Sequence, residues 1–259
     1  MLKLTEHGNG VTWLTLSRPD KRNALDGHTV VEWIDHLDAL AKKNHLRLLV
    51  INGEGQDFCA GADLAWMQKM AQESDEVNQA DAFLLASLFR KIDIMPCPVL
   101  TLVQGKVLGG GMGIVAASDM VIAADNTTFA FPEARMGLSP SVVSPYIIRL
   151  IGERAARYYF FTAESFSAER AFELGMVQQV VSDHALLKSA EVVIEKILKN
   201  SPHALRESKK LIQSVAKQTV SDELTHMTST HLATMRLSPD AQEGINAFFA
   251  KRKPVWVEV

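Results

Sequence analysis

Two glycine-containing turns carry the residue types that chemistry at a carbonyl group would need. Gly109, Gly110 and Gly111 interrupt the apolar stretch VLGGGMGIVAASD, and the loop 59–63 reads CAGAD. Three successive glycines cost backbone entropy that a merely buried helix would avoid by using alanine. Each turn follows a strand-like run and precedes a helical one, so each is expected to present unpaired N–H groups at a helix start. Two such groups aimed at one oxygen would form an oxyanion hole, and tight loop packing is the alternative explanation.

A carboxylate follows the glycine triplet in the segment FAFPEARMGLSP. Glu133 stands directly after Pro132, whose ring fixes φ and removes a backbone donor, and this favours a non-helical turn that holds the glutamate. A carboxyl group held in this way is suited to general acid–base catalysis on a neighbouring substrate. The nearby acids Asp119 and Asp125 stand at the ends of an expected strand, and we interpret them as structural residues.

Alternating strands and helices are expected to position these groups. The segment 11–16, VTWLTL, predicts a strand, and Asp26 has the type and position of an N-cap for a helix reaching about Lys43. This order predicts an α/β fold with a parallel sheet, whose strands end at the edge where ligands usually bind. Further strands are expected at 46–52, 98–105 and 119–125, and helices within 63–94 and at 110–118.

The sequence changes character after about residue 183. From there on, helical periodicity replaces the alternation of strands and helices, and no further strand is indicated. Amphipathic helices are expected within 185–200, 202–218, 221–237 and 239–253. We therefore predict two regions: a core, 1–183, which contains the site, and a helical region, 184–259.

Composition and charge limit the classes of partner. The chain has 259 residues, 47% of them hydrophobic, and a formal net charge of -3. This charge predicts no general attraction to nucleic acid or to an anionic membrane. Two cysteines, Cys59 and Cys97, are too few for a disulfide framework, and no apolar run is long enough to span a bilayer. We expect a soluble, cytoplasmic protein.

Five segments, taken in order, resemble the crotonase superfamily, the enoyl-CoA hydratase/isomerase family. They are RPDKRNAL, DFCAGADL, QGKVLGGGMG, FAFPEARMGLSP and AFFAKRKPVW, which together extend over nearly the whole chain. The resemblance implies a spiral of ββα turns with a helical C-terminal region. It also implies a homotrimer, or a hexamer formed by two trimers, with an acyl-CoA thioester as the substrate.

The resemblance also implies roles for individual residues. Ala60 and Gly110 would donate their backbone N–H groups to the thioester carbonyl, and Glu133 would be the acid–base residue. Lys251, in the C-terminal run KRK, would bind the 3′-phosphate of CoA as a point charge. No metal and no cofactor is expected, because CoA enters as part of the substrate. Contacts with the rest of the acyl-CoA are expected from Arg22, Ala24, Ala62, Asp63, Leu64, Gly109 and Pro132.

The sequence departs from the family pattern at one position. Family hydratases commonly carry a second glutamate two residues after the glycine triplet, where this chain has Gly113. One carboxylate can serve a hydratase, which adds water across C2 and C3, or a Δ3,Δ2-enoyl-CoA isomerase, which moves a proton between carbons. A third alternative is a non-catalytic acyl-CoA-binding subunit. Of these, we expect the hydratase.

A finer resemblance favours hydration of a branched substrate. GADLAWMQ and SPYIIRLIGERAARYYFFTAE, with the segment between the glycine triplet and LSP, are similar to bacterial methylglutaconyl-CoA and γ-carboxygeranoyl-CoA hydratases. That subgroup also tends to have glycine at the position of Gly113, and its substrates carry a second carboxylate. Arg135 would be a candidate partner for that carboxylate.

Overall fold

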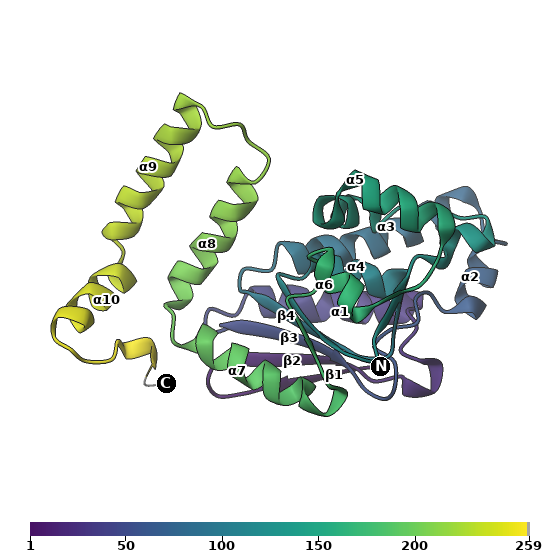
Figure 1. Ribbon diagram of the computed structural model, residues 1–259, viewed down its shortest axis with the longest axis horizontal. Helices are drawn as coiled ribbons and strands as arrows, with labels where there is room; N and C mark the ends of the chain where they lie inside the picture. Colours follow the sequence, from purple (N-terminus) through teal and green to yellow (C-terminus); the bar gives the residue numbers. More distant parts are fainter. Residues whose placement is uncertain (258–259) are drawn as a thin grey trace. The chain divides into compact units, whose positions relative to one another are not determined.

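The computed structural model describes residues 1–257 and divides into two compact units (Figure 1). The first unit comprises Met1–Met95 and Val99–Glu191. The second comprises Pro96–Pro98 and the chain from Val192 onward. Among residues 1–257, no helix combines the length and the apolar character that crossing a bilayer requires.

The main sheet of the first unit confirms the predicted α/β class. Its strand order is β1-β2-β3-β4-β6-β9; β1 pairs antiparallel with β2, and the other neighbours pair in parallel. The central strands are buried on both faces, which explains their nearly continuous apolar sequences. The strands are β1 (Leu2–Glu6), β2 (Val11–Leu16), β3 (Leu48–Gly53), β4 (Val99–Val103), β6 (Met120–Ala124) and β9 (Gln179–Val181).

A smaller sheet, which the sequence analysis missed, has the order β5-β7-β8. Its strands are β5 (Lys106–Leu108), β7 (Thr128–Ala130) and β8 (Phe166–Ser167), too short to produce a readable alternation pattern. Stacked rings stabilise this sheet: the centroids of Phe129 and Phe166 are 5.6 Å apart. The glycine triplet follows β5 of this sheet directly, and so it is not at the end of β4 as the sequence suggested.

Helices of the first unit pack one on the next beside the main sheet, in the order α1, α3, α4, α5 (Figure 1). The predicted N-cap is confirmed, since the Asp26 side chain accepts a hydrogen bond from Thr29 N at the start of α1. These helices are α1 (Gly27–Ala41), α2 (Leu64–Met70), α3 (Asp75–Asp93), α4 (Gly110–Ala117), α5 (Ser144–Thr162) and α6 (Ala168–Glu173).

The second unit contains the amphipathic helices that were expected in the C-terminal region. Ser201, Ser221 and Ser238 cap α8, α9 and α10 by accepting hydrogen bonds from backbone N–H groups. The compact units divide within α7, after Glu191, whereas the change of sequence character lies near residue 183. The helices are α7 (Leu186–Leu198), α8 (Pro202–Val215), α9 (Asp222–Arg236) and α10 (Pro239–Phe249).

Candidate active site

The two glycine-containing turns lie side by side because their backbones pair. Cys59 and Val107 form an isolated parallel bridge, in which Cys59 N donates to Lys106 O at 3.0 Å and Leu108 N donates to Cys59 O at 2.9 Å. The pairing joins the CAGAD loop to β5, immediately before the glycine triplet. The two segments, about fifty residues apart in the sequence, are thus held at one place in the first unit.

The glycine triplet is required by close approaches from three directions. A Cβ on Gly109, whose φ is +46°, would lie 3.1 Å from Glu133 Oε1 and 3.9 Å from Gly61 Cα. A Cβ on Gly110 would lie 3.0 Å from Leu25 Cδ1. At Gly111, a Cβ would lie 2.9 Å from the carbonyl oxygen of Cys59. Part of the requirement for glycine is therefore tight packing between the two turns.

The backbone N–H groups of the two turns differ in availability. Gly110 begins α4, and its N–H has no acceptor within residues 1–257, as is usual in a first helical turn. Ala60 was predicted to be the second donor. Its N–H instead donates to the Arg22 carbonyl oxygen at 3.0 Å, so this group is already engaged.

Two N–H groups of the CAGAD loop, those of Gly61 and Ala62, have no acceptor within the described part of the chain. Leu25 and Ala62 form a parallel bridge, with Leu25 N donating to Gly61 O and Asp63 N donating to Leu25 O, both at 2.8 Å. In this pattern the bridging residue directs its own N–H away from the partner segment. Accordingly, the Ala62 N–H has no acceptor within the described part of the chain. The sequence analysis named Ala62 only as a residue that contacts CoA.

Glu133 stands beside the turns as an incompletely satisfied acid. Pro132 begins the short 3-10 helix η2 (Pro132–Met136), as its fixed φ favours, and Glu133 follows it. The carboxyl is partly buried, and its Oε2 atom is shielded from solvent with no hydrogen-bond partner in residues 1–257. Burial raises the pKa of Glu133 above its ordinary value. A carboxylate with a raised pKa and a free oxygen has the properties of a general base.

The position of the missing second glutamate is filled by an aromatic ring. A Cβ on Gly113 would lie 2.4 Å from Cζ of Phe89, a fully buried side chain of α3. The same ring packs edge-on against Tyr146, with centroids 6.3 Å apart. With the ring in this place, even a Cβ on residue 113 would overlap it. The departure at Gly113 can be read from the sequence, but the contact with Phe89 cannot, because no local pattern connects two residues on different helices.

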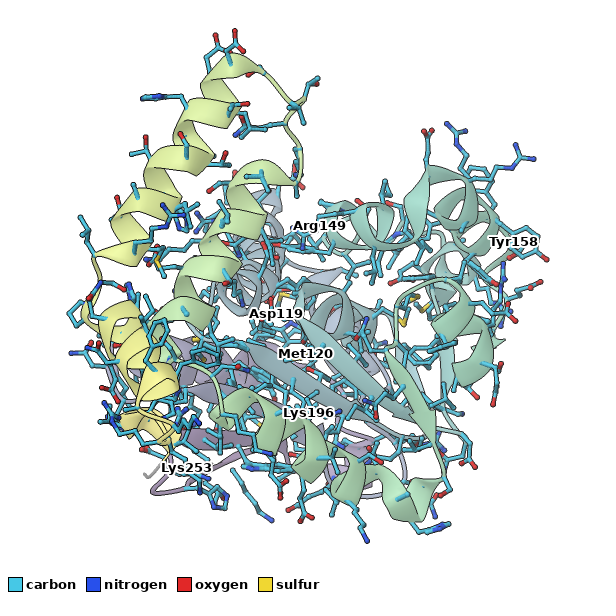
Figure 2. The ribbon with its side chains drawn as sticks, turned by 60° about the vertical axis from the view of Figure 1, so that its left-hand side comes forward. Asp119, Met120, Arg149, Tyr158, Lys196 and Lys253 are labelled. Atoms are coloured by element: carbon cyan, nitrogen blue, oxygen red, sulfur yellow. The ribbon has the colours of Figure 1, made fainter. Side chains whose placement is uncertain are left out.

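Asp119 and Asp125 stand immediately before and after β6, and hydrogen bonds at both positions join neighbouring strands. Asp119, which precedes Met120 at the beginning of β6 (Figure 2), accepts a hydrogen bond from Val99 N at 2.8 Å. Asp125 N donates to Val181 O at 2.7 Å, which joins the end of β6 to β9.

The residues predicted to contact CoA have different exposures. Arg22 has a left-handed backbone (φ 50°), and its exposed side chain approaches Asp57 at 3.7 Å. Ala24 is buried, whereas Leu64, the first residue of α2, is 71% exposed. The Asp63 carboxylate is turned inward and accepts hydrogen bonds from Ala65 N and Trp66 N.

Lys251 belongs to the second unit. It is exposed and has a left-handed backbone (φ 52°), and it stands two residues after the end of α10. Its N–H donates to Phe248 O at 3.1 Å, which ends the helix. The role of its side chain in binding CoA stays a prediction.

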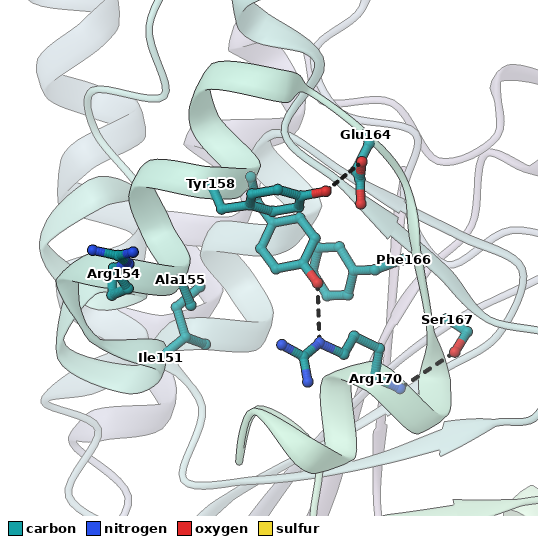
Figure 3. Close-up of a pocket in the computed structure, with 9 residues that line it drawn as sticks. Ile151, Arg154, Ala155, Tyr158, Glu164, Phe166, Ser167 and Arg170 are labelled. Atoms are coloured by element: carbon teal, nitrogen blue, oxygen red, sulfur yellow. Dashed lines mark hydrogen bonds between the residues drawn. The ribbon is translucent and has the colours of Figure 1, made fainter.

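A separate cavity of about 730 Å³ lies between the C-terminal half of α5 and α6 (Figure 3). Tyr158 donates to Glu164 at 3.0 Å, and Arg170 Nε donates to the Tyr159 hydroxyl oxygen at 3.1 Å. None of the residues predicted for the site lines this cavity.

Comparison with known proteins identifies the family. The family model described as Enoyl-CoA hydratase/isomerase matches residues 6–258. The chain is 33% identical to the crotonyl-CoA hydratase of Syntrophomonas wolfei, covering 93% of this chain and 92% of that protein. It is also 33% identical to a mevalonyl-coenzyme A hydratase of Aspergillus fumigatus, covering 94% and 90%.

A solved structure supports the same assignment. The crystal structure of an enoyl-CoA hydratase from Shewanella pealeana has a TM-score of 0.95 at 40% identity and covers 98% of this chain and 95% of that one. The expected crotonase-like fold is therefore confirmed. The chain belongs to the enoyl-CoA hydratase/isomerase family.

Proposed function

We propose that the protein is an enoyl-CoA hydratase, which adds water across the C2–C3 double bond of an enoyl-CoA thioester. The observation that carries this proposal is the partly buried Glu133 carboxyl, with an unpaired oxygen, beside the glycine turn that begins α4. Membership of the family supports an acyl-CoA thioester as the substrate. We propose no metal and no cofactor apart from the CoA carried by the substrate.

The oxyanion hole is assigned to Ala62 and Gly110. Both N–H groups lack acceptors in the described chain, whereas the Ala60 N–H is engaged by Arg22. Charge develops on the thioester oxygen in the transition state, so two preorganised donors act mainly there. A crystal structure with a bound acyl-CoA tests this assignment. The thioester oxygen is expected within hydrogen-bond distance of Ala62 N and Gly110 N, and contact with Ala60 N would contradict it.

A single carboxylate completes the addition in two proton transfers. Glu133 takes a proton from water as the water oxygen forms a bond to C3. The electron pair of the double bond moves toward the thioester, and the resulting enolate oxygen accepts from the two amides. The protonated Glu133 then gives its proton to C2, which restores the carboxylate and leaves the 3-hydroxyacyl thioester.

The second candidate is a Δ3,Δ2-enoyl-CoA isomerase, which the Gly113–Phe89 contact favours. Because the Phe89 ring occupies the space beside residue 113, that position supplies no carboxylate to hold the attacking water. An isomerase needs only Glu133, which would remove a proton from C2 and return it to C4. A non-catalytic acyl-CoA-binding subunit is the third reading.

A panel of enoyl-CoAs in deuterated water separates these readings. Product mass rises by one whole water for a hydratase, whereas an isomerase moves the double bond and exchanges deuterium without net addition. We expect addition of water, and we expect no addition with Glu133→Gln. Double-bond migration alone would overturn the hydratase proposal in favour of the isomerase. Saturable binding without any product would assign the binding subunit.

We propose a branched enoyl-CoA with a second carboxylate, such as 3-methylglutaconyl-CoA, as the preferred substrate. Arg135, two residues after Glu133, is exposed and has no acceptor within residues 1–257. The two relatives at 33% identity are named for different acyl groups, so overall identity does not select the acyl chain. Arg135→Ala is expected to raise KM for 3-methylglutaconyl-CoA more than KM for crotonyl-CoA.

A matched control for Arg135 is Arg154→Ala, since Arg154 is another exposed arginine and lines the separate α5–α6 cavity. It should change neither KM. Ready hydration of crotonyl-CoA together with no turnover of 3-methylglutaconyl-CoA would exclude the branched substrate.

Lys251 is proposed to bind the CoA 3′-phosphate. Lys251→Ala should raise KM for acyl-CoA, up to about fivefold for an exposed ion pair, with kcat nearly unchanged. Lys217→Ala, another exposed lysine of the second unit, is the control. An unchanged KM would return Lys251 to the role of a solvated surface charge.

A homotrimer, or a hexamer of two trimers, is proposed as the assembled form. Leu237, Phe248 and Phe249 are each more than three-quarters exposed in the second unit, and a neighbouring subunit would cover such side chains. Light scattering coupled to gel filtration measures the state, and a monomer at micromolar concentration would contradict the proposal.

A further inference from the structure

Arg18 connects two helix starts through one guanidinium group. Its NH1 atom donates to Ala24 O at 3.1 Å, to Asp26 Oδ2 at 2.7 Å and to Thr29 Oγ1 at 3.2 Å. Its NH2 atom donates to Asp63 Oδ2 at 3.5 Å. The Arg18 side chain is 17% exposed, and both carboxylates are 15% exposed, so these are not solvated surface pairs.

Each of the two carboxylates is also a helix cap. Asp26 Oδ1 accepts from Thr29 N at 2.8 Å at the start of α1. Asp63 Oδ1 accepts from Ala65 N at 3.0 Å and from Trp66 N at 3.2 Å at the start of α2. The second oxygen of each group faces Arg18. The planar guanidinium, with donors in a fixed arrangement, suits such a double contact better than an ammonium group would.

Arg18 therefore forms hydrogen bonds with residues adjacent to both partners of the Leu25–Ala62 bridge. Ala24 precedes Leu25 and is held through its carbonyl oxygen, and Asp63 follows Ala62 and is held through its carboxylate. The bridge decides the direction of the unengaged Ala62 N–H.

We propose that Arg18 is a positioning residue that holds the Ala62 amide at the angle required for the thioester oxygen, by tying Ala24 and Asp26 to Asp63. The expected decrease in kcat rests on the proposed function, whereas the expected loosening of the CAGAD loop does not. Loss of one oxyanion-hole donor lowers kcat about 100- to 1000-fold, so a tilted donor should have a smaller effect.

A second brace allows the fold to survive loss of Arg18. The Trp66 ring covers Gly27, where an added Cβ would lie 2.3 Å from Cζ2, and Trp66 Nε1 donates to Asp81 at 3.1 Å. These contacts attach α2 to α1 and α3 independently of Arg18. Substitution of Arg18 should then loosen the 58–66 segment without releasing α2.

The experiment compares Arg18→Met and Arg18→Lys with Arg47→Met. Arg47 is a buried arginine, placed before β3 at the opposite end of that strand from the CAGAD loop. Hydrogen–deuterium exchange of peptides covering 58–66, the melting temperature, kcat, and affinity for free CoA are measured for each. Free CoA has no thioester carbonyl, so its binding does not use the Ala62 amide.

For Arg18→Met we expect faster exchange at 58–66, kcat reduced about 10- to 100-fold, and affinity for free CoA within twofold of the wild type. Arg18→Lys should be intermediate, and millimolar methylguanidine should restore part of the activity of Arg18→Met. The absorption maximum of a bound 3-aryl-enoyl-CoA, which moves to the red when the carbonyl is polarised, should move less than in the wild type. Arg47→Met should lower the melting temperature and leave kcat, exchange at 58–66 and affinity for free CoA unchanged.

Unchanged kcat with a lower melting temperature would overturn the proposal and leave Arg18 a purely structural role. Unchanged exchange at 58–66 would overturn it as well. If the wild-type protein converted no enoyl-CoA, the proposed function would fail. Exchange at 58–66 and the absorption maximum would still decide whether Arg18 positions the amide.

Discussion

Positions 133 and 113 differ in whether the surrounding side chains leave space for an acidic residue. At 133 a carboxyl group is partly buried, has one oxygen without a partner in the described chain, and lies against the glycine turn. At 113 the side-chain space is occupied by the Phe89 ring. The first unit thus has one carboxyl group beside the glycine turn and apolar packing at the position where family hydratases commonly carry a second glutamate. A residue from another helix therefore helps to set how many acids can stand beside this turn.

Removing the acid at 133 should have the largest effect. Glu133→Gln is expected to lower kcat about 100- to 10,000-fold, because general acid–base catalysis contributes roughly that much. The raised pKa of Glu133 means that the ionised form is disfavoured in the folded state at neutral pH, so the uncharged Gln should raise the melting temperature. Steady-state kinetics and calorimetry at neutral pH measure both.

Glu153→Gln on the exposed surface of α5 is the control for this substitution and should leave kcat unchanged. The stabilisation by Gln should shrink as pH falls from the raised pKa of Glu133 toward the ordinary glutamate value of 4.5, and it should be absent below 4.5, where both states bind the proton. A fully active Glu133→Gln variant would remove the contrast between the two positions.

Adding a methyl group at 113 tests the other side of the comparison. Gly113→Ala should destabilise the protein by about 1–3 kcal/mol, because the new Cβ would overlap the buried Phe89 ring. In the double variant Gly113→Ala with Phe89→Leu, the loss should be smaller than the sum of the two single losses. Chemical denaturation gives the free energy of unfolding for each.

Gly8→Ala provides a neutral reference for the glycine substitution, since a Cβ there has no neighbour within 4 Å. Its change should stay within about 0.5 kcal/mol. Additive effects of the substitutions at 113 and 89 would show that the ring does not exclude a side chain from position 113.

The pH profile should show the smallest effect. The raised pKa of Glu133 predicts that kcat/KM increases with pH through a midpoint above 4.5, as the carboxyl loses its proton and becomes able to accept one from water. Stability should change in the opposite sense and decline as pH rises through the same midpoint. Rates measured with saturating and limiting enoyl-CoA at several pH values test this, and a midpoint at or below 4.5 would refute it.

The fold and part of the site were predictable because their signals are local. The strand at 11–16 and the Asp26 cap follow from alternation and from one side chain three residues from its acceptor. Pro132 places Glu133 in a short turn for a similar reason. The short strands of the small sheet were missed because two or three residues give no period.

The amide donors show where local reasoning stops. Ala60 and Ala62 are both small residues of one loop, and nothing within the loop distinguishes their N–H groups. The distinction comes from hydrogen bonds with Arg22 and Leu25, which lie almost forty residues earlier. Because the Ala60 N–H is engaged by Arg22, the proposed donor is Ala62 instead.

By itself, the sequence determined the α/β class, the family, the two glycine turns and the single glutamate, because motif order and short-range periodicity survive in one dimension. Tertiary structure alone decided which amides remain free, why position 113 excludes an acid, and how Arg18 reaches both Asp26 and Asp63. These features depend on atoms from distant segments meeting within about 3 Å, the range over which hydrogen bonds and steric exclusion act.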